Sequence, residues 1–293
     1  MYSSQYNNAP LFGHKTMKFL SYFKSIANCS PYQSSFPEIS PEIQSYINNF
    51  LYENNLQLII INKFTITDHK DWYYKLEPPT QNDINFYLPL LILELSLYPK
   101  LFFEKIKLKK IILSNSIIFH SESFEQYRAA LPDYELDSFS FVLSCKERNL
   151  KYIRKVIHHE LFHYFYFMYK GKYENKDDLW EMFNPKSFEY STSSSIWSEK
   201  DLIEKDYQGN NSFVSEFSKL KLEEDKAEVF SFMMTSGNDI RDLMKREGVI
   251  GKCLYIKQLM EEFDKEGFNT QRNDNFWQKV IKYKKEVVDV YYI

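Results

Sequence analysis

The sequence predicts an α+β protein in which a small mixed sheet packs on one long helix and a mainly helical half follows. Short apolar runs of strand type occur only before residue 146, whereas helical periodicity dominates from residue 149 onward. The chain is 18% aromatic and 44% hydrophobic, with only 7 glycines in 293 residues. This composition is typical of a densely packed, helix-rich protein and not of a β-sandwich punctuated by glycine turns.

The first predicted element is a helix that begins after Ser40. Ser40 is a suitable N-cap, Pro41 suits the first helical position, and the helix should run to about Glu53. Its expected apolar face comprises Ile43, Ile47, Phe50 and Leu51. Residues 1–40 are rich in Ser, Asn and Tyr and predict a loosely ordered arm. Residues 41–293 then form one domain, with an N-terminal lobe to about residue 171 and a helical C-terminal lobe over 172–293.

Leu56 to Ile61 predicts a buried strand, and residues 83–107 predict helix interrupted at Pro89 and Pro99. This apolar stretch carries charged residues and proline breaks, so we expect a buried helix pair and no membrane span.

Two further strands are predicted before the long helix. They cover Lys109 to Phe119 and Ser138 to Cys145, and the second places Phe139 and Phe141 on one face. If its edge were exposed, an extended peptide could pair with it by β-augmentation. A sheet edge with no ligand is the alternative.

The long helix carries a metal-binding pattern. Residues Asn149 to Lys170 contain neither Pro nor Gly, and Gly171 is a suitable residue to follow the helix. Within this helix, His159 and His163 lie one turn apart on one face and can hold one tetrahedral ion. Glu160 lies between them in the His-Glu-x-x-His pattern of zinc hydrolases and is the candidate general base. The alternative is a core helix that carries two histidines. His158 should point away from the metal face.

A second predicted helix, Leu222 to Thr235, offers the third ligand. Glu224 and Glu228 share one face, so one can bind the metal while the other accepts a hydrogen bond from a ligand histidine. Glu228 lies deeper in the apolar half, where a carboxylate without a partner is costly and a metal would remove that cost. Asp178 and Glu181 are alternative ligands. The metzincin class is excluded because the positions that need its Gly and third His hold Tyr166 and Tyr169.

The pairing of His159–His163 with Glu224–Phe230 resembles the predicted zinc-binding metallopeptidases of gluzincin type. It is more distantly similar to the anthrax-lethal-factor-like peptidases, which also use a Glu-x-x-Ala-Glu helix. Trp180 with Asn184–Tyr190 resembles the Trp…Asn-Pro-x-x-Phe-x-Tyr segment of the first group, and Ser212–Phe217 resembles its Gly-Phe-Val-Ser-x-Tyr segment. The resemblance runs from about residue 150 to residue 234.

The resemblance implies a zincin-like fold and a Zn²⁺ cofactor held by His159, His163 and Glu228. It also implies that Glu160 is the base and that Glu224 is the carboxylate behind a ligand histidine. Two positions depart from the family pattern, because Ser212 stands where Gly is usual and Phe217 stands where relatives carry Tyr. If that Tyr stabilises the oxyanion, other groups must replace it, and the candidates are Tyr190 and Tyr207, with His120 a weaker third.

The expected function is therefore zinc-dependent metalloendopeptidase activity on a peptide or protein substrate. A catalytically weak, zinc-bearing module that binds peptides is one alternative, suggested by Phe217. A toxin or effector peptidase specific for one partner protein is another. The net charge of −3 gives no electrostatic basis for binding nucleic acid.

Compartment is indicated only by the cysteines and the N-terminus. Cys29, Cys145 and Cys253 are too far apart in sequence to suggest a disulfide framework or a structural zinc site. The first 31 residues lack a basic start followed by an apolar core. We therefore expect a cytoplasmic protein, or one exported without a classical signal peptide.

Overall fold

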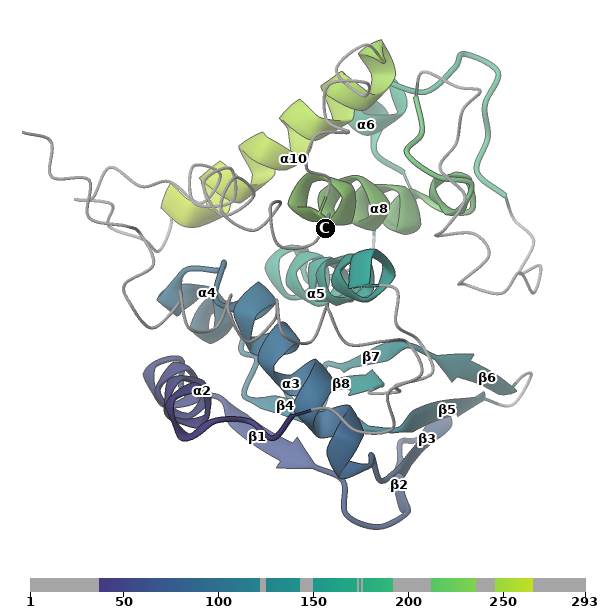
Figure 1. Cartoon of the computed structure of the whole chain (residues 1–293). Coiled ribbons are helices and arrows are strands. Elements are labelled where there is room, and N and C mark those ends of the chain that lie inside the picture. Colours follow the sequence, from purple (N-terminus) through teal and green to yellow (C-terminus); the bar gives the residue numbers. More distant parts are fainter. Residues whose placement is uncertain are drawn as a thin grey trace, which may run out of the picture.

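A computed structural model of the chain describes residues 37–121, 125–142, 150–172, 174, 176–191, 212–235 and 246–265. Within these residues the fold is α+β, as the sequence predicts (Figure 1). Residues 1–36 of the expected arm and the end of the 138–145 strand lie outside the described residues.

The N-terminal helices begin where their capping residues predict. Helix α2 spans Pro41–Glu53, and the Ser40 side chain accepts a hydrogen bond from the Ile43 backbone N–H. Helix α3 spans Gln81–Leu95 and is capped by Thr80. Pro89 lies inside α3, so only the second of the two expected proline breaks is present. The chain restarts at helix α4, Lys100–Lys105, directly after that second proline.

The first sheet is mixed and has the strand order β1-β4-β8-β7. Strands β1 (Gln57–Ile60), β4 (Lys110–Ser114) and β8 (Ser138–Val142) are parallel, and β7 (Ala130–Asp133) pairs antiparallel with β8. The expectation that the 138–145 strand offers an exposed edge is therefore wrong, because β8 has a neighbour on both sides. The edges are β7 and β1, and the position of β1 explains why it is half-exposed instead of buried.

A second, antiparallel sheet covers the far face of the first. Its order is β2-β3-β5-β6, formed by Thr65–Asp68, Trp72–Glu77, Ser116–Ser121 and Glu125–Arg128. The run expected as one strand over 109–119 divides at Asn115, so that β4 joins the first sheet and β5 joins the second. The two sheets share a small apolar cluster of Tyr74, Leu76, Ile112, Ile117 and Leu131. Because both faces of the first sheet are covered, Ser138 and Ser140 of β8 are buried along with Phe139 and Phe141.

Helix α5 spans Leu150–Lys170 and ends at Gly171, whose φ of +76° suits glycine after a helix end. Figure 1 shows α5 between the sheet and N-terminal helices on one side and α8 (Leu222–Thr235) with α10 (Glu247–Lys265) on the other. The short helices α6 (Asp178–Glu181) and η1 (Phe217–Lys219) complete this half among the described residues. In the part of the chain described here, no helix has the length and apolarity needed to cross a bilayer.

The start of α10 allows a test of the packing in the C-terminal half. A Cβ added at Gly248 would lie 2.6 Å from the Phe183 carbonyl oxygen and 2.9 Å from the Ser212 Cα, and both of these are backbone atoms. We therefore expect Gly248→Ala to lower the free energy of unfolding by about 1–3 kcal/mol, as overpacked interiors do. Urea denaturation measures this change. Leu254→Ala, at an exposed position of the same helix, is the control and should leave stability nearly unchanged.

Candidate metal centre

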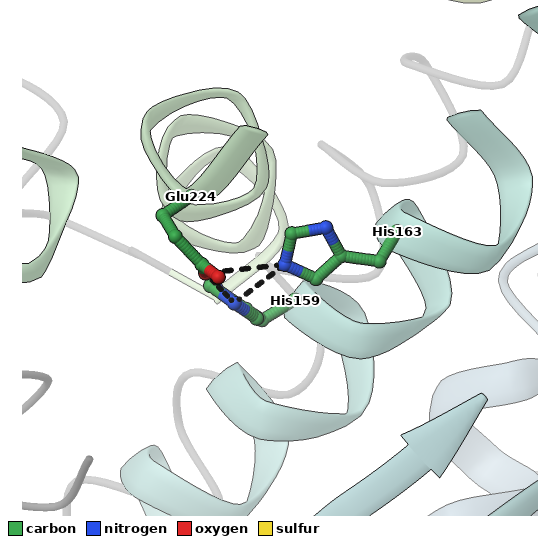
Figure 2. A group of neighbouring side chains, drawn as sticks. All are labelled: His159, His163 and Glu224. Atoms are coloured by element: carbon green, nitrogen blue, oxygen red, sulfur yellow. Dashed lines mark hydrogen bonds and ion pairs between the residues drawn. The ribbon is translucent and has the colours of Figure 1, made fainter. Parts of the chain in front are cut away.

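Three side chains from two helices meet at one point between α5 and α8. His159 and His163 project from α5 and Glu224 projects from α8 (Figure 2). The Glu224 Oε2 lies 3.0 Å from the His159 Nε2 and 3.2 Å from the His163 Nε2, and the two Nε2 atoms are 3.1 Å apart. Both histidines are buried, whereas the Glu224 side chain is 22% exposed. The cluster therefore lies inside the protein with one side open to solvent.

The donor atoms of this cluster fit a zinc ion. Ligand atoms bound tetrahedrally to zinc at 2.0–2.1 Å would be roughly 3.3 Å apart, close to the three separations observed. Two imidazoles and one carboxylate are also a ligand set that zinc enzymes use, with a fourth position left for water or substrate. A neutral imidazole has one N–H and one lone pair, so a cation at the meeting point would satisfy both Nε2 atoms and the carboxylate together.

Glu228 lies behind this cluster. Its Oε1 accepts a hydrogen bond from the His159 Nδ1 at 3.0 Å, on the side of the ring away from the three donor atoms. Its Oε2 lies 2.8 Å from the Lys155 Nζ and accepts a hydrogen bond from the Ser215 hydroxyl. A carboxylate in this place fixes the tautomer of His159 and leaves its Nε2 lone pair available to a metal.

The contacts of the two glutamates differ from those expected. Glu224, expected behind a histidine, supplies the third donor atom, and Glu228, expected as the ligand, supports His159 from behind. Glu228 is fully buried, as its apolar surroundings predict. However, Lys155, Ser215 and His159 satisfy its carboxylate, so burial alone does not require a metal on Glu228.

The charges of the cluster are strongly coupled. Burial alone would lower the pKa of His159, but its hydrogen bonds to Glu224 and Glu228 raise it well above the usual range. Burial would raise the pKa of Glu224, yet the neighbouring His163 and His159 hold it well below the usual range. Burial likewise opposes ionisation of Glu228, and the Lys155 ammonium outweighs it, so that the pKa of Glu228 is about 2. Both glutamates are therefore carboxylates at neutral pH.

Glu160 follows His159 directly on α5. It is half-buried, whereas both histidines of the cluster are buried. As the residue next to His159, it is less enclosed than the two histidines. This is the setting required of a group that takes a proton from water.

Tyr190 forms its hydrogen bonds with side chains outside the cluster. Its hydroxyl donates to the Asp225 Oδ2 at 2.7 Å and accepts hydrogen bonds from the Trp180 Nε1 and the Asn184 Nδ2, both at 3.1 Å. The same Asp225 oxygen accepts from the Lys252 Nζ at 2.6 Å, which ties α10 to α8. The structure does not bring Tyr190 into the three-atom cluster.

The remaining candidates are also placed away from the cluster or not described. Tyr207 lies outside the described residues. His120 is on β5 of the second sheet, where it stacks on Tyr73 with ring centroids 4.4 Å apart. On α6, Asp178 is an exposed partner of Lys176, and Glu181 accepts a hydrogen bond from the Asp177 backbone.

His158 belongs to a buried network on another face of α5. Its Nε2 lies 2.9 Å from the Glu94 Oε2 of α3, and its Nδ1 lies 2.8 Å from the Tyr98 hydroxyl. Arg154 also pairs with Glu94, and the Glu94 side chain is fully buried. This network joins α5 to the N-terminal helices and agrees with the expectation that His158 points away from the metal face.

The network predicts a loss of stability in acid. Burial raises the pKa of Glu94, but the Arg154 guanidinium and His158 outweigh it and lower the pKa from 4.5 to about 2. A depressed carboxyl pKa stabilises the fold above pH 4.5 and loses that effect as the pH falls toward 2, with an amplitude of roughly 3 kcal/mol.

We expect Glu94→Gln to remove this part of the acid sensitivity while destabilising the protein at pH 7. Unfolding free energies measured between pH 6 and pH 3 test this. Gln at the exposed Glu104 should leave the pH profile as in wild type, and an unchanged profile in Glu94→Gln would contradict the assignment.

Sequence reasoning missed Lys155 and Ser215, the partners of Glu228. Lys155 had one available signal, since it precedes His159 by four residues and so shares its helix face. Lysine is seldom buried, which makes such a partner hard to expect. Ser215 comes from a segment far from α5 in sequence, and its contact depends on the tertiary fold.

Comparison with known proteins adds one structural similarity. Neither a scan of protein-family models nor a search of curated proteins gave a match. Among solved structures, the chain is similar to the crystal structure of a "putative zinc-binding metallo-peptidase" from Bacteroides caccae. The TM-score is 0.45 at 14% identity, and the match covers 86% of this chain and 96% of that chain. Similarity at this level establishes no activity, so the function has to be inferred from the side chains of the site.

Proposed function

We propose that this chain is a zinc-dependent metallopeptidase of zincin-like fold that hydrolyses peptide bonds. His159, His163 and Glu224 are the proposed zinc ligands, with Glu228 holding His159 from behind. The observation that carries the proposal is the triangle of the His159 Nε2, His163 Nε2 and Glu224 Oε2 atoms, with edges of 3.0–3.2 Å. No other group of His, Cys, Asp and Glu side chains suited to a metal was found in the described part of the chain.

Each group of the site has a separate role in the proposed hydrolysis. Zinc, when bound, supplies a Lewis acid that polarises the scissile carbonyl and makes a bound water more acidic. Glu160 takes a proton from the attacking water and delivers it to the leaving amine. Glu228 keeps the Nδ1 proton on His159 throughout, so that this imidazole remains a neutral donor through Nε2.

The test is cleavage of a diverse peptide library by the full chain loaded with zinc. Mass spectrometry should detect new peptide termini that vanish when a chelator is added and return when zinc is restored. The absence of chelator-sensitive cleavage, in a protein shown to bind zinc, would contradict peptidase function.

Phe217 supports a second candidate, a zinc-bearing module that binds peptides with little turnover. Its ring lies against His159, with centroids 5.6 Å apart, and it brings no hydroxyl to this side of the cluster. Removing one oxyanion donor from an enzyme typically lowers kcat by about 10²–10³-fold.

Phe217→Tyr is therefore expected to raise the rate of peptide cleavage, by about tenfold if the new hydroxyl recovers part of that stabilisation. The zinc affinity should not change, because the ligands are untouched. Steady-state kinetics on a peptide identified in the library measure the rate. A fall in kcat at equal zinc content would show that a hydroxyl at position 217 does not help the reaction.

A further inference from the structure

Two buried cations occupy consecutive positions on α5 and make similar contacts with two different helices. Arg154 pairs with Glu94 of α3, and Glu94 also contacts His158, four residues after Arg154. Lys155 pairs with Glu228 of α8, and Glu228 also contacts His159, four residues after Lys155. Each arrangement is a cation, a carboxylate and an imidazole. Only the second adjoins the proposed metal centre.

The two sets have similar burial. The side chains of Arg154 and Lys155 are 9% and 10% exposed, and both carboxylates are fully buried. A buried carboxylate is stable only when a positive charge or several donors offset the loss of water. Within the described ranges, Glu94 is not part of any group of side chains suited to a metal. Glu228 is separated from the proposed metal position only by the imidazole of His159.

Two carboxylates, Glu224 and Glu228, flank His159 on opposite sides. A divalent ion bound at the cluster would offset the charge of Glu224 directly and that of Glu228 across the imidazole of His159. Without such an ion, the Lys155 ammonium, 2.8 Å from the Glu228 Oε2, supplies a permanent positive charge on the buried side. Lys155 and the metal would therefore both offset the charge of Glu228, Lys155 by direct contact and the metal across the imidazole of His159.

We propose that Lys155 is a built-in counter-ion that keeps the metal centre folded and preformed in the absence of its metal. This inference rests on the proposed function, namely that the cluster of His159, His163 and Glu224 binds zinc. It predicts that Lys155 contributes more to the stability of the metal-free protein than to that of the zinc-bound protein. By linkage, removal of Lys155 makes folding more dependent on zinc and makes zinc binding tighter, because the ion then offsets a charge left without its ammonium.

A plain structural ion pair predicts a different result. If Lys155 only joins α5 to α8, its loss lowers the stability of the metal-free and zinc-bound forms equally, and a distorted site binds zinc more weakly. Arg154→Met is the matched control, since it removes a cation of the same burial from the adjacent position of the same helix. We expect Arg154→Met to lower both stabilities by the same amount and to leave the zinc affinity unchanged.

The experiment uses the full chain as wild type, Lys155→Met, Lys155→Arg and Arg154→Met. Thermal unfolding is measured with a chelator and with zinc, and the zinc affinity is measured by competition with a chromophoric chelator. For Lys155→Met we expect the zinc-induced rise in Tm to exceed that of wild type and the affinity to increase roughly tenfold, within the range of ordinary coupling energies. Lys155→Arg keeps the charge and should behave as wild type does.

A double variant tests whether Lys155 affects zinc binding through its contact with Glu228. In a Glu228→Gln background the neutral amide needs no counter-ion, so adding Lys155→Met should change the zinc-induced rise in Tm very little. Lys155→Gln, which keeps a donor and loses the charge, is expected to match Lys155→Met. A Lys155→Met protein that folds only with zinc would be the extreme form of the expected result.

Three outcomes overturn the inference: equal losses of stability with and without zinc, weaker zinc binding in Lys155→Met, or a variant that stays unfolded in both conditions. Failure of wild type to bind zinc would instead overturn the proposed function. The two failures are thus distinguishable.

Discussion

Glu160→Gln should retain zinc and lose peptide hydrolysis by about 10²–10⁴-fold, the usual contribution of a positioned general base. The substitution removes the carboxylate of half-buried Glu160, the residue after His159, and leaves the three donor atoms in place. Zinc content measured by elemental analysis should equal that of wild type, while the rate of peptide cleavage falls.

Undiminished cleavage by this variant would rule out Glu160 as the base. A loss of zinc together with activity would be equally informative, because it would show that the substitution disturbed the helix that carries His159 and His163. Circular dichroism spectra of wild type and variant should match, which would show that the helix is intact.

Glu224→Ala should weaken zinc binding far more than Glu228→Gln does. The first change removes one of three donor atoms, whereas the second weakens a hydrogen bond behind His159 and should lower affinity by roughly 10–100-fold. Competition with chelators of graded strength measures both affinities.

Glu223→Ala is the matched control for Glu224→Ala. Glu223 precedes Glu224 on α8 but is not part of the cluster. Its Oε1 lies 3.7 Å from the Nζ of the exposed Lys221. Its removal should leave zinc affinity as in wild type. If Glu228→Gln instead abolished binding and Glu224→Ala did not, the ligand would be Glu228, as the sequence alone suggested.

Elements whose signals are local were predictable. Ser40 and Pro41 predicted the start of α2, and an acidic first turn followed by an apolar second half predicted α8 with its observed bounds, Leu222–Thr235. The spacing of His159 and His163 predicted two donor atoms on one helix face, and the structure brings them to 3.1 Å. Each of these inferences depends on residues of a single helix or its cap.

Pairing across the chain was not predictable. Strands β2, β3, β6 and β7 were missed, and the run over 109–119 gives no sign that it divides between two sheets at Asn115. Which strand forms an edge depends on the order in which strands pair, and this order is set by packing between distant segments. The expectation of a peptide-binding edge on β8 was wrong for that reason.

The sequence limited the third metal ligand to two main candidates, Glu224 and Glu228, but could not decide between them. Glu224 and Glu228 lie one turn apart on the same face of α8, so spacing allows either to reach the histidines. Depth in the apolar half favoured Glu228, on the assumption that only a metal would offset its burial. Lys155 and Ser215 offset it instead, and neither is recognisable as a partner without the packing of α5 against α8.

The sequence distance between the donors also determines when this centre can form. His159 and Glu224 are 65 residues apart, and they meet only where α8 docks on α5. Helix α5 can form from local contacts, but closing so long a loop must await the association of the two halves of the chain. During refolding, the colour of bound cobalt should therefore develop later than the helical circular dichroism signal, so that the metal reports on the final docking step.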